Sequence, residues 1–266
     1  DEQKLLSHEF RCQAVRDRDS LRMEFSGHPH YTGMRVIYSV RVTEKGIQFR
    51  PEVRNIPGDL TLEWIEPLLL PMADSNGKVF LPQTEGILLD EPLKNLEYQE
   101  PGWHRYRFYP GYAQMQFMAY FSGNHGLYYA PHDAGHGTKF LDAKANSGKV
   151  ALMIRNYCGL FPGQDYVPDF EMALYPFEGD WMEPCEIYRD WMETSTVLPP
   201  KGNMPSFVNE SPVVMIYPVR GNGDDKGEMT PNEYYPYVKA MPVVRELADK
   251  FNSRLLPLLM HWEGTD

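Results

Sequence analysis

The sequence predicts a mainly β protein, in which an antiparallel β-sandwich is followed by the first strand-helix-strand unit of an α/β fold. Three observations lead to this fold class. Short runs of alternating apolar and polar residues, separated by Pro and Gly, fill the first two-thirds of the chain, which is typical of sandwiches built from many short strands. The apolar period becomes helical near Gly179, and a continuous apolar run follows at residues 212–217, as expected for a parallel strand covered on both faces.

Two hairpins define the predicted sandwich. Residues 35–42 and 47–53 alternate apolar and polar side chains, and a polar turn at residues 43–46 joins them. A second alternating run precedes the turn at residues 122–126 and the apolar run at residues 127–130. Because successive side chains of a strand point to opposite faces, each hairpin can place its apolar side chains on one buried face.

A helix is expected after the sandwich. Asp180 stands at the position of an N-cap, where a carboxylate accepts a backbone N–H. Apolar side chains then recur at helical spacing, at Trp181, Cys185, Tyr188, Trp191 and Met192. We interpret this stripe as the face of a helix packed on the sandwich, in preference to a ligand-binding face.

The segment after the linker has the order strand, helix, strand. Residues 212–217 and 255–260 are the two apolar strands. Between them, Thr230 and Glu233 form a capping box with Pro231 at the first helical position. A unit of this kind is almost always right-handed with parallel strands.

These patterns divide the chain into three parts. Residues 1–193 form the predicted β-sandwich domain with its C-terminal helix. Residues 194–211 are rich in Pro and polar side chains without a period, which is typical of an interdomain linker. Residues 212–266 form the predicted start of a further α/β domain.

Composition narrows the class of ligand. The net charge of −11 and the pI near 5.2 argue against nucleic acid as a partner, because phosphate binding needs clustered Lys and Arg. A neutral carbohydrate fits better, since sugars are bound by aromatic faces, carboxylates and amides, and 13% of the residues are aromatic. The cysteines Cys12, Cys158 and Cys185 are too scattered for a disulfide framework or a zinc site, and we expect no cofactor and no metal.

The sequence holds no run of apolar residues long enough for a membrane span. Its first residues lack the apolar core of a signal peptide. These patterns do not settle the compartment, and an extracellular or periplasmic location is favoured over a cytoplasmic one.

The carboxyl ends of parallel strands lie at one edge, where α/β proteins bind ligands. Tyr217 ends the first predicted strand, and Arg220 and Asp224 follow it. Trp262 and Glu263 follow the second strand. We expect these side chains to converge on a binding site. The alternative is an exposed polar loop with a Trp that packs against a neighbouring segment.

A second group of polar side chains follows the strand at residues 127–130. His132, Asp133, His136 and Lys139 lie within eight residues, from 132 to 139, in a Gly-rich stretch. Three interpretations stay open: a metal site, for which a fourth ligand is not predictable; a loop that contacts sugar; and ordinary hydrogen bonding within a turn.

Several motifs resemble a bacterial family of unknown-function proteins related to α-galactosidase-like glycoside hydrolases. They lie in "YPGYAQMQFMAYFSGNHGLYYAPHDAGHGTKF" and "FEGDWMEPCEIYRDWM", with Tyr-Pro-Gly, Gly-Leu-Tyr, His-Asp and Gly-Asp-Trp as the specific elements. The resemblance extends over residues 63–266. It implies a galactose-mutarotase-like β-supersandwich followed by a (β/α)8 barrel, a TIM barrel.

The resemblance also implies roles for residues. His132 and Asp133 would belong to a sandwich loop that reaches the substrate pocket, while Arg220, Trp262 and Glu263 would line the mouth of the barrel. In related retaining enzymes the catalytic carboxylate pair follows later barrel strands. We therefore expect the catalytic pair, and the remainder of the barrel or a partner chain, to lie outside these residues.

The sequence thus predicts the N-terminal region of a glycoside-hydrolase-like protein that binds a carbohydrate and, in its complete form, hydrolyses O-glycosidic bonds. One alternative is a carbohydrate-binding module without catalytic activity. Another is a mutarotase-like sugar isomerase that uses His132 or His136 with a carboxylate as acid and base.

Overall fold

The structure is a computed structural model that describes residues 3–72, 77–84, 86–97, 107–146, 148–195, 206–210, 213–218 and 237–260. The chain forms two compact units, Asp1–Leu198 and Pro199–Asp266. The division between them falls within residues 194–211, the stretch predicted as a linker.

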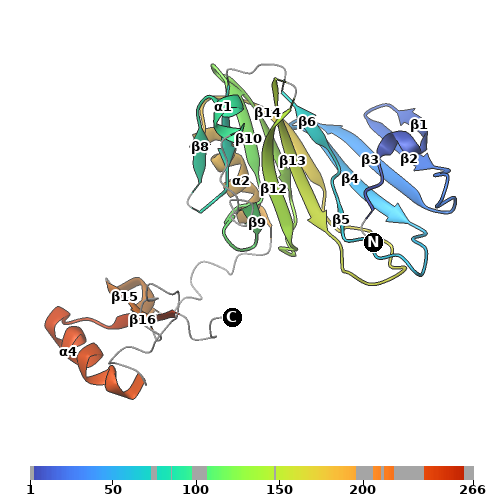
Figure 1. Cartoon of the computed structure of the whole chain (residues 1–266). Helices are drawn as coiled ribbons and strands as arrows, with labels where there is room; N and C mark the ends of the chain where they lie inside the picture. The colour runs from blue at the N-terminus through green and yellow to red at the C-terminus, as the bar shows by residue number, and fades with distance from the viewer. Residues whose placement is uncertain are drawn as a thin grey trace. The chain divides into compact units, whose positions relative to one another are not determined.

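The first unit contains a large antiparallel sheet (Figure 1). Within the described residues it has nine strands in the order β1-β2-β3-β4-β14-β11-β10-β7-β8. Their bounds, in that order, are Arg11–Asp17, Ser20–Ser26, Arg35–Thr43, Gly46–Arg54, Met172–Glu178, His125–Pro131, Met118–Ser122, Lys78–Leu81 and Ile87–Leu89.

A smaller antiparallel sheet faces the large one (Figure 1). Its described strands run in the order β5-β13-β12-β9, and β6 also pairs with β13. They span Trp64–Ile65 (β5), Lys149–Tyr157 (β13), Lys139–Asn146 (β12), Phe108–Tyr109 (β9) and Leu69–Pro71 (β6). Both sheets contribute fully buried apolar side chains to one core, including Val79 and Tyr129 from the large sheet and Leu152 and Ile154 from the small one. The predicted mainly β sandwich is therefore confirmed.

Both predicted hairpins are present. In the first, β3 and β4 pair from Arg35 opposite Arg54 to Thr43 opposite Gly46. Gly46 has a φ of 139°, and a Cβ there would lie 2.6 Å from the carbonyl oxygen of Leu174, so only glycine fits this turn. In the second, Ser122 pairs with His125 across the β10–β11 turn, which is tighter than the five-residue turn predicted from the sequence.

Helix α2 (Met182–Thr194) packs on the outer face of the large sheet (Figure 1). Tyr188 is buried against the sheet, and Cys185, Trp191 and Met192 pack beside it, as the helical stripe predicted. Trp181, the first residue of that stripe, is instead exposed. The predicted N-cap was wrong: the N-cap residue is Trp181. Asp180 instead accepts a hydrogen bond from the backbone N–H of Met182 at 2.8 Å, so the helix begins one residue later than expected.

Two short helical segments complete the first unit. The 3₁₀ turn η1 covers Ser7–Glu9, and α1 covers Pro92–Glu97. Leu93 and Leu96 of α1 pack against the core between the sheets. No helix within the described ranges is long and apolar enough to cross a membrane.

The second unit has parallel strands, as predicted. Strand β15 (Val213–Pro218) pairs with β16 (Leu255–Met260) from Val213 opposite Leu255 to Pro218 opposite Met260. The 3₁₀ turn η3 (Tyr237–Lys239) and helix α4 (Met241–Phe251) lie between them in the chain. A short helix, α3 (Ser206–Glu210), occupies part of the predicted linker, where Phe207 lies 5.1 Å from the Arg254 guanidinium. This helix was not predicted from the sequence.

Candidate functional site

The candidate site is the loop of residues 132–138, which joins the two sheets of the sandwich. It begins where β11 of the large sheet ends and leads into β12 of the small sheet. Its backbone is tied to both neighbours, because His132 donates to the carbonyl of Glu171 at 2.9 Å and Tyr157 donates to that of Thr138 at 3.1 Å. The loop is thus held by the residue that precedes β14 of the large sheet and by β13 of the small sheet.

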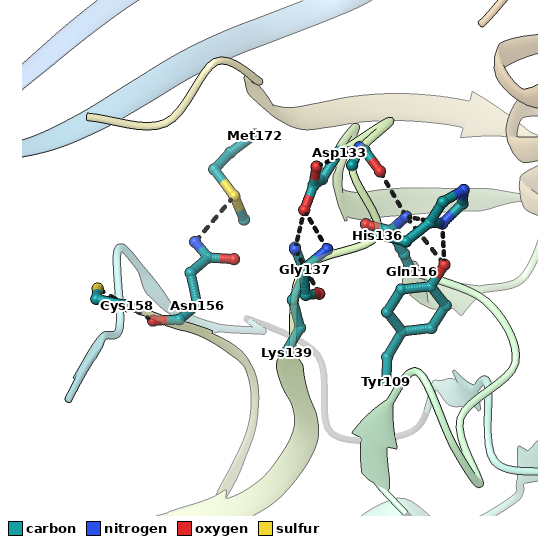
Figure 2. Close-up of polar contacts among 10 residues, drawn as sticks. Tyr109, Gln116, Asp133, His136, Gly137, Lys139, Asn156, Cys158 and Met172 are labelled. Carbon is teal, nitrogen blue, oxygen red and sulfur yellow. Dashed lines mark hydrogen bonds and ion pairs between the residues drawn. The ribbon is translucent and has the colours of Figure 1, made fainter. Parts of the chain in front are cut away.

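Asp133 anchors this loop from inside (Figure 2). Its Oδ1 accepts the N–H of Gly135 at 2.8 Å and its Oδ2 accepts that of Gly137 at 2.9 Å. Lys139 forms an ion pair with Oδ2 and also donates to the carbonyl of Gly137 at 2.9 Å. Asp133 is 4% exposed and Lys139 is 2% exposed. Both carboxylate oxygens are therefore satisfied within the loop.

The charge state of this pair follows from two opposing effects. Burial lowers the pKa of the Lys139 ammonium, whereas its hydrogen bond with Asp133 raises it. Because the positive and the negative group are in contact, the pair presents little net charge to the surface of the loop.

His132 points toward the outer face of the large sheet, under α2. Its Nε2 lies 3.0 Å from the hydroxyl oxygen of Tyr128. Its ring stacks on Trp191, with ring centroids 4.9 Å apart and an interplanar angle of 11°. Burial, and to a smaller extent the charge of Lys45, lowers the pKa of His132 from 6.5 to about 4. The imidazole is therefore neutral near neutral pH, and its contacts are those of a packed side chain.

His136 faces a different set of partners. Its Nδ1 forms a hydrogen bond with the hydroxyl of Tyr109 and lies 3.3 Å from Nε2 of Gln116. Gln116 is fully buried and donates to the carbonyl of Asp133 at 2.9 Å. Figure 2 shows the Tyr109 hydroxyl and the Gln116 amide converging on the same ring nitrogen. His136 has a φ of 54°, in the left-handed region that few residues other than glycine adopt.

The structure brings together only part of the predicted site. His132 and Asp133 are neighbours in the loop, but one packs under α2 and the other anchors the loop. Tyr217 lies in β15, and the placement of its side chain is not described. Arg220, Asp224, Trp262 and Glu263 lie outside the described residues. The carboxyl ends of β15 and β16 do share one edge.

Tyr109 and Gln116, the two side chains that contact Nδ1 of His136, were not predicted as site residues. Tyr109 belongs to the Tyr-Pro-Gly motif, which was the available signal. No sequence motif marks Gln116, because it occupies an ordinary polar position in the run of alternating apolar and polar residues before β10. Among the described residues, no group of three or more His, Cys, Asp or Glu is placed to hold a metal ion.

A large cavity lies apart from this loop. It has a volume of about 1170 Å³ and lies beside the inner faces of β2, β3 and β4. Its lining is mostly apolar and includes Phe25, Tyr38, Val40 and Phe49. Neither His132 nor Asp133 is among the described residues that line it.

Comparison with solved structures finds a similar fold in part of a larger enzyme. The α-N-acetylgalactosaminidase NagBb from Bifidobacterium bifidum, in its Gal-NHAc-DNJ complex, matches with a TM-score of 0.61 and 11% identity over 95% of this chain. Its GalNAc complex matches with a TM-score of 0.57, also with 11% identity over 95% of the chain. This chain spans 43% of the length of that enzyme.

A putative aldose 1-epimerase from Escherichia coli matches with a TM-score of 0.37 and 13% identity, over 63% of this chain and 68% of that one. No protein-family model and no curated protein sequence matches the chain. The described architecture of the first unit is a large antiparallel β-sandwich, in agreement with the mainly β fold that the sequence predicts.

Proposed function

We propose that the chain is the N-terminal region of a glycoside-hydrolase-like protein that acts on glycans and, in its complete form, hydrolyses O-glycosidic bonds. The observation that carries this proposal is the likeness to the α-N-acetylgalactosaminidase over 95% of the chain, with a TM-score of 0.61. That coverage includes residues of both compact units. The order of a large antiparallel sandwich followed by a parallel strand-helix-strand unit therefore supports the proposal as a whole.

In this proposal the chain binds substrate and does not supply the catalytic carboxylates. Retaining glycosidases need two carboxyl groups about 5–5.5 Å apart, one as nucleophile and one as acid/base. We expect that pair to follow later strands of a (β/α)8 barrel. The shared edge at the ends of β15 and β16 supports a sugar-binding role for the residues near it. These are Tyr217 in the first strand, Arg220 and Asp224 after it, and Trp262 and Glu263 after the second strand.

The contacts of His132 and Asp133 argue against these two residues as the acid and base of the isomerase alternative. Acid and base catalysis needs titratable groups that can reach the reacting atoms. The oxygens of Asp133 are occupied by Gly135, Gly137 and Lys139, and the ring of His132 lies between Tyr128 and Trp191. Neither group is free to exchange protons with a sugar in this arrangement.

The test is a hydrolysis screen with the complete protein and with this chain alone. Nitrophenyl α- and β-glycosides of galactose, glucose and N-acetylgalactosamine are the substrates. We expect the complete protein to release nitrophenol from at least one α-glycoside and this chain to bind the corresponding sugar without turnover. Binding without turnover by the complete protein would favour a carbohydrate-binding module. Faster anomer interconversion by this chain would instead favour the isomerase.

A further inference from the structure

The hydrogen bonds around His136 fix which of its ring nitrogens carries the proton. The starting point is the orientation of the Gln116 amide. Its Nε2 lies 2.9 Å from the carbonyl oxygen of Asp133, and a carbonyl oxygen only accepts, so the NH₂ group of Gln116 must face it. The same Nε2 lies 3.3 Å from Nδ1 of His136 and 3.3 Å from the hydroxyl oxygen of Tyr109. The second N–H of Gln116 therefore points at this pair of atoms.

The Tyr109 hydroxyl is a second donor to the same ring nitrogen. Burial raises the pKa of Tyr109, so its hydroxyl keeps its proton near neutral pH and can donate to Nδ1 of His136. A hydrogen on Nδ1 would instead confront the N–H of Gln116. Nδ1 is therefore the acceptor, and in the neutral imidazole the proton resides on Nε2.

The Nε2 side of the ring is left for a ligand. No described residue forms a hydrogen bond with Nε2 of His136, and this atom is not among the buried polar atoms without a partner. Figure 2 shows it on the side of the ring turned away from Tyr109 and Gln116. The side chain is half-buried, so one edge of a fixed imidazole presents a single N–H donor to the surface.

The surroundings of this donor suit a neutral acceptor. The nearby ammonium of Lys139 is neutralised by Asp133 and buried with it, so it adds no positive charge that would select an anion. The loop is also held before any ligand binds, because the backbone N–H of His136 donates to the carbonyl of Asp133 at 3.2 Å. A donor fixed in advance loses little conformational entropy on binding.

We propose that His136 is a glycan-binding residue of the sandwich, which donates its Nε2–H to a hydroxyl or N-acetyl carbonyl oxygen of a neutral sugar. Tyr109 and Gln116 are positioning residues that hold the ring in this tautomer. This inference rests on the proposed function and makes it more specific, since it names His136 in place of His132 and Asp133 as the contact from the loop.

The first test reads the tautomer directly. Heteronuclear NMR of the histidine-labelled chain distinguishes a protonated from an unprotonated ring nitrogen. We expect His136 to carry its proton on Nε2 in the wild type and to become a mixture of tautomers in Tyr109→Phe, which removes the hydroxyl donor. A proton on Nδ1 in the wild type would overturn the proposal, whatever the chain binds.

The second test measures affinity by NMR titration with methyl α-galactoside, methyl α-glucoside, N-acetylgalactosamine and, as an anionic comparison, methyl glucuronide. Loss of one hydrogen bond should weaken binding of the preferred neutral sugar by about tenfold in His136→Ala. His136→Gln, which keeps an N–H donor, should recover part of this loss. His125→Ala, at the other end of β11 and exposed, should bind as the wild type does.

The outcomes separate this proposal from the proposed function. If the wild type binds a sugar and His136→Ala binds it equally well, His136 is not a contact and the proposed function stands. If the glucuronide is bound best, the ligand class is wrong. If neither this chain nor the complete protein binds any of the sugars, the proposed function fails and the role of His136 fails with it.

Discussion

The buried imidazole of His132 should make the sandwich sensitive to acid. Its pKa falls from 6.5 to about 4 on folding, so between these values the unfolded chain binds a proton that the folded chain does not. The free energy of unfolding must then fall as the pH falls through this window. One pKa unit corresponds to about 1.4 kcal/mol, so the full effect is about 3 kcal/mol, present above the upper value and lost below the lower one.

A substitution isolates this contribution. His132→Gln keeps a group that can hydrogen-bond with Tyr128 but does not titrate. The difference in unfolding free energy between wild type and variant should therefore shift by about 3 kcal/mol, in favour of the variant, between about pH 7 and about pH 4. Urea unfolding followed by hydrogen exchange of peptides from β11 and β14 reports on this unit alone. The control is His125→Gln, at an exposed position. A pH dependence that is identical in wild type and His132→Gln would refute the reasoning.

Two further substitutions test the packing of the same unit by thermal unfolding. Asp133→Asn leaves the Lys139 ammonium buried without its carboxylate and should lower the free energy of unfolding by about 3–5 kcal/mol. The double variant that also carries Lys139→Met should recover part of this loss. If it recovers none, Asp133 does not stabilise the fold through its ion pair with Lys139. Gly126→Ala places a methyl group against the ring of Phe177 and should cost about 1–3 kcal/mol. Gly58→Ala is the matched control, because its added methyl group meets no atom within 4 Å. An equal loss of unfolding free energy in the two variants would contradict the close packing of Gly126 against Phe177.

The sequence predicted the fold well wherever apolar residues recur at the spacing of a strand or a helix. The alternation of residues 35–42 and 47–53 identifies β3 and β4, because one face of each strand must be buried. The apolar runs at residues 212–217 and 255–260 identify the parallel pair for a similar reason. The start of α2 was misplaced, because Asp180 can accept a backbone N–H two residues away without being the N-cap. Helix α3 has no local signal in the sequence, and it was not predicted.

The site was harder to predict than the fold. His132, Asp133 and His136 have the same kinds of polar side chain in one short loop, and their spacing does not reveal which of them is buried. The structure separates them by their partners: Trp191 covers His132, and Lys139 pairs with Asp133. The role of Gln116 depends on contacts between segments distant in sequence, so it could not be read from the alternating run in which it lies.

The most direct test of whether the sandwich contacts a sugar is a titration of this chain followed through its backbone amide NMR signals. The ligand added is the sugar of a glycoside that the complete protein hydrolyses. The account predicts saturable changes in the signals of residues 132–138 and of the segment that holds Tyr109 and Gln116. Little change is expected in the turn between β10 and β11, which lies at the opposite end of β11 from the loop. If the complete protein hydrolyses the glycoside but no signal of the loop at residues 132–138 moves, the sandwich does not contact the sugar and the account is contradicted.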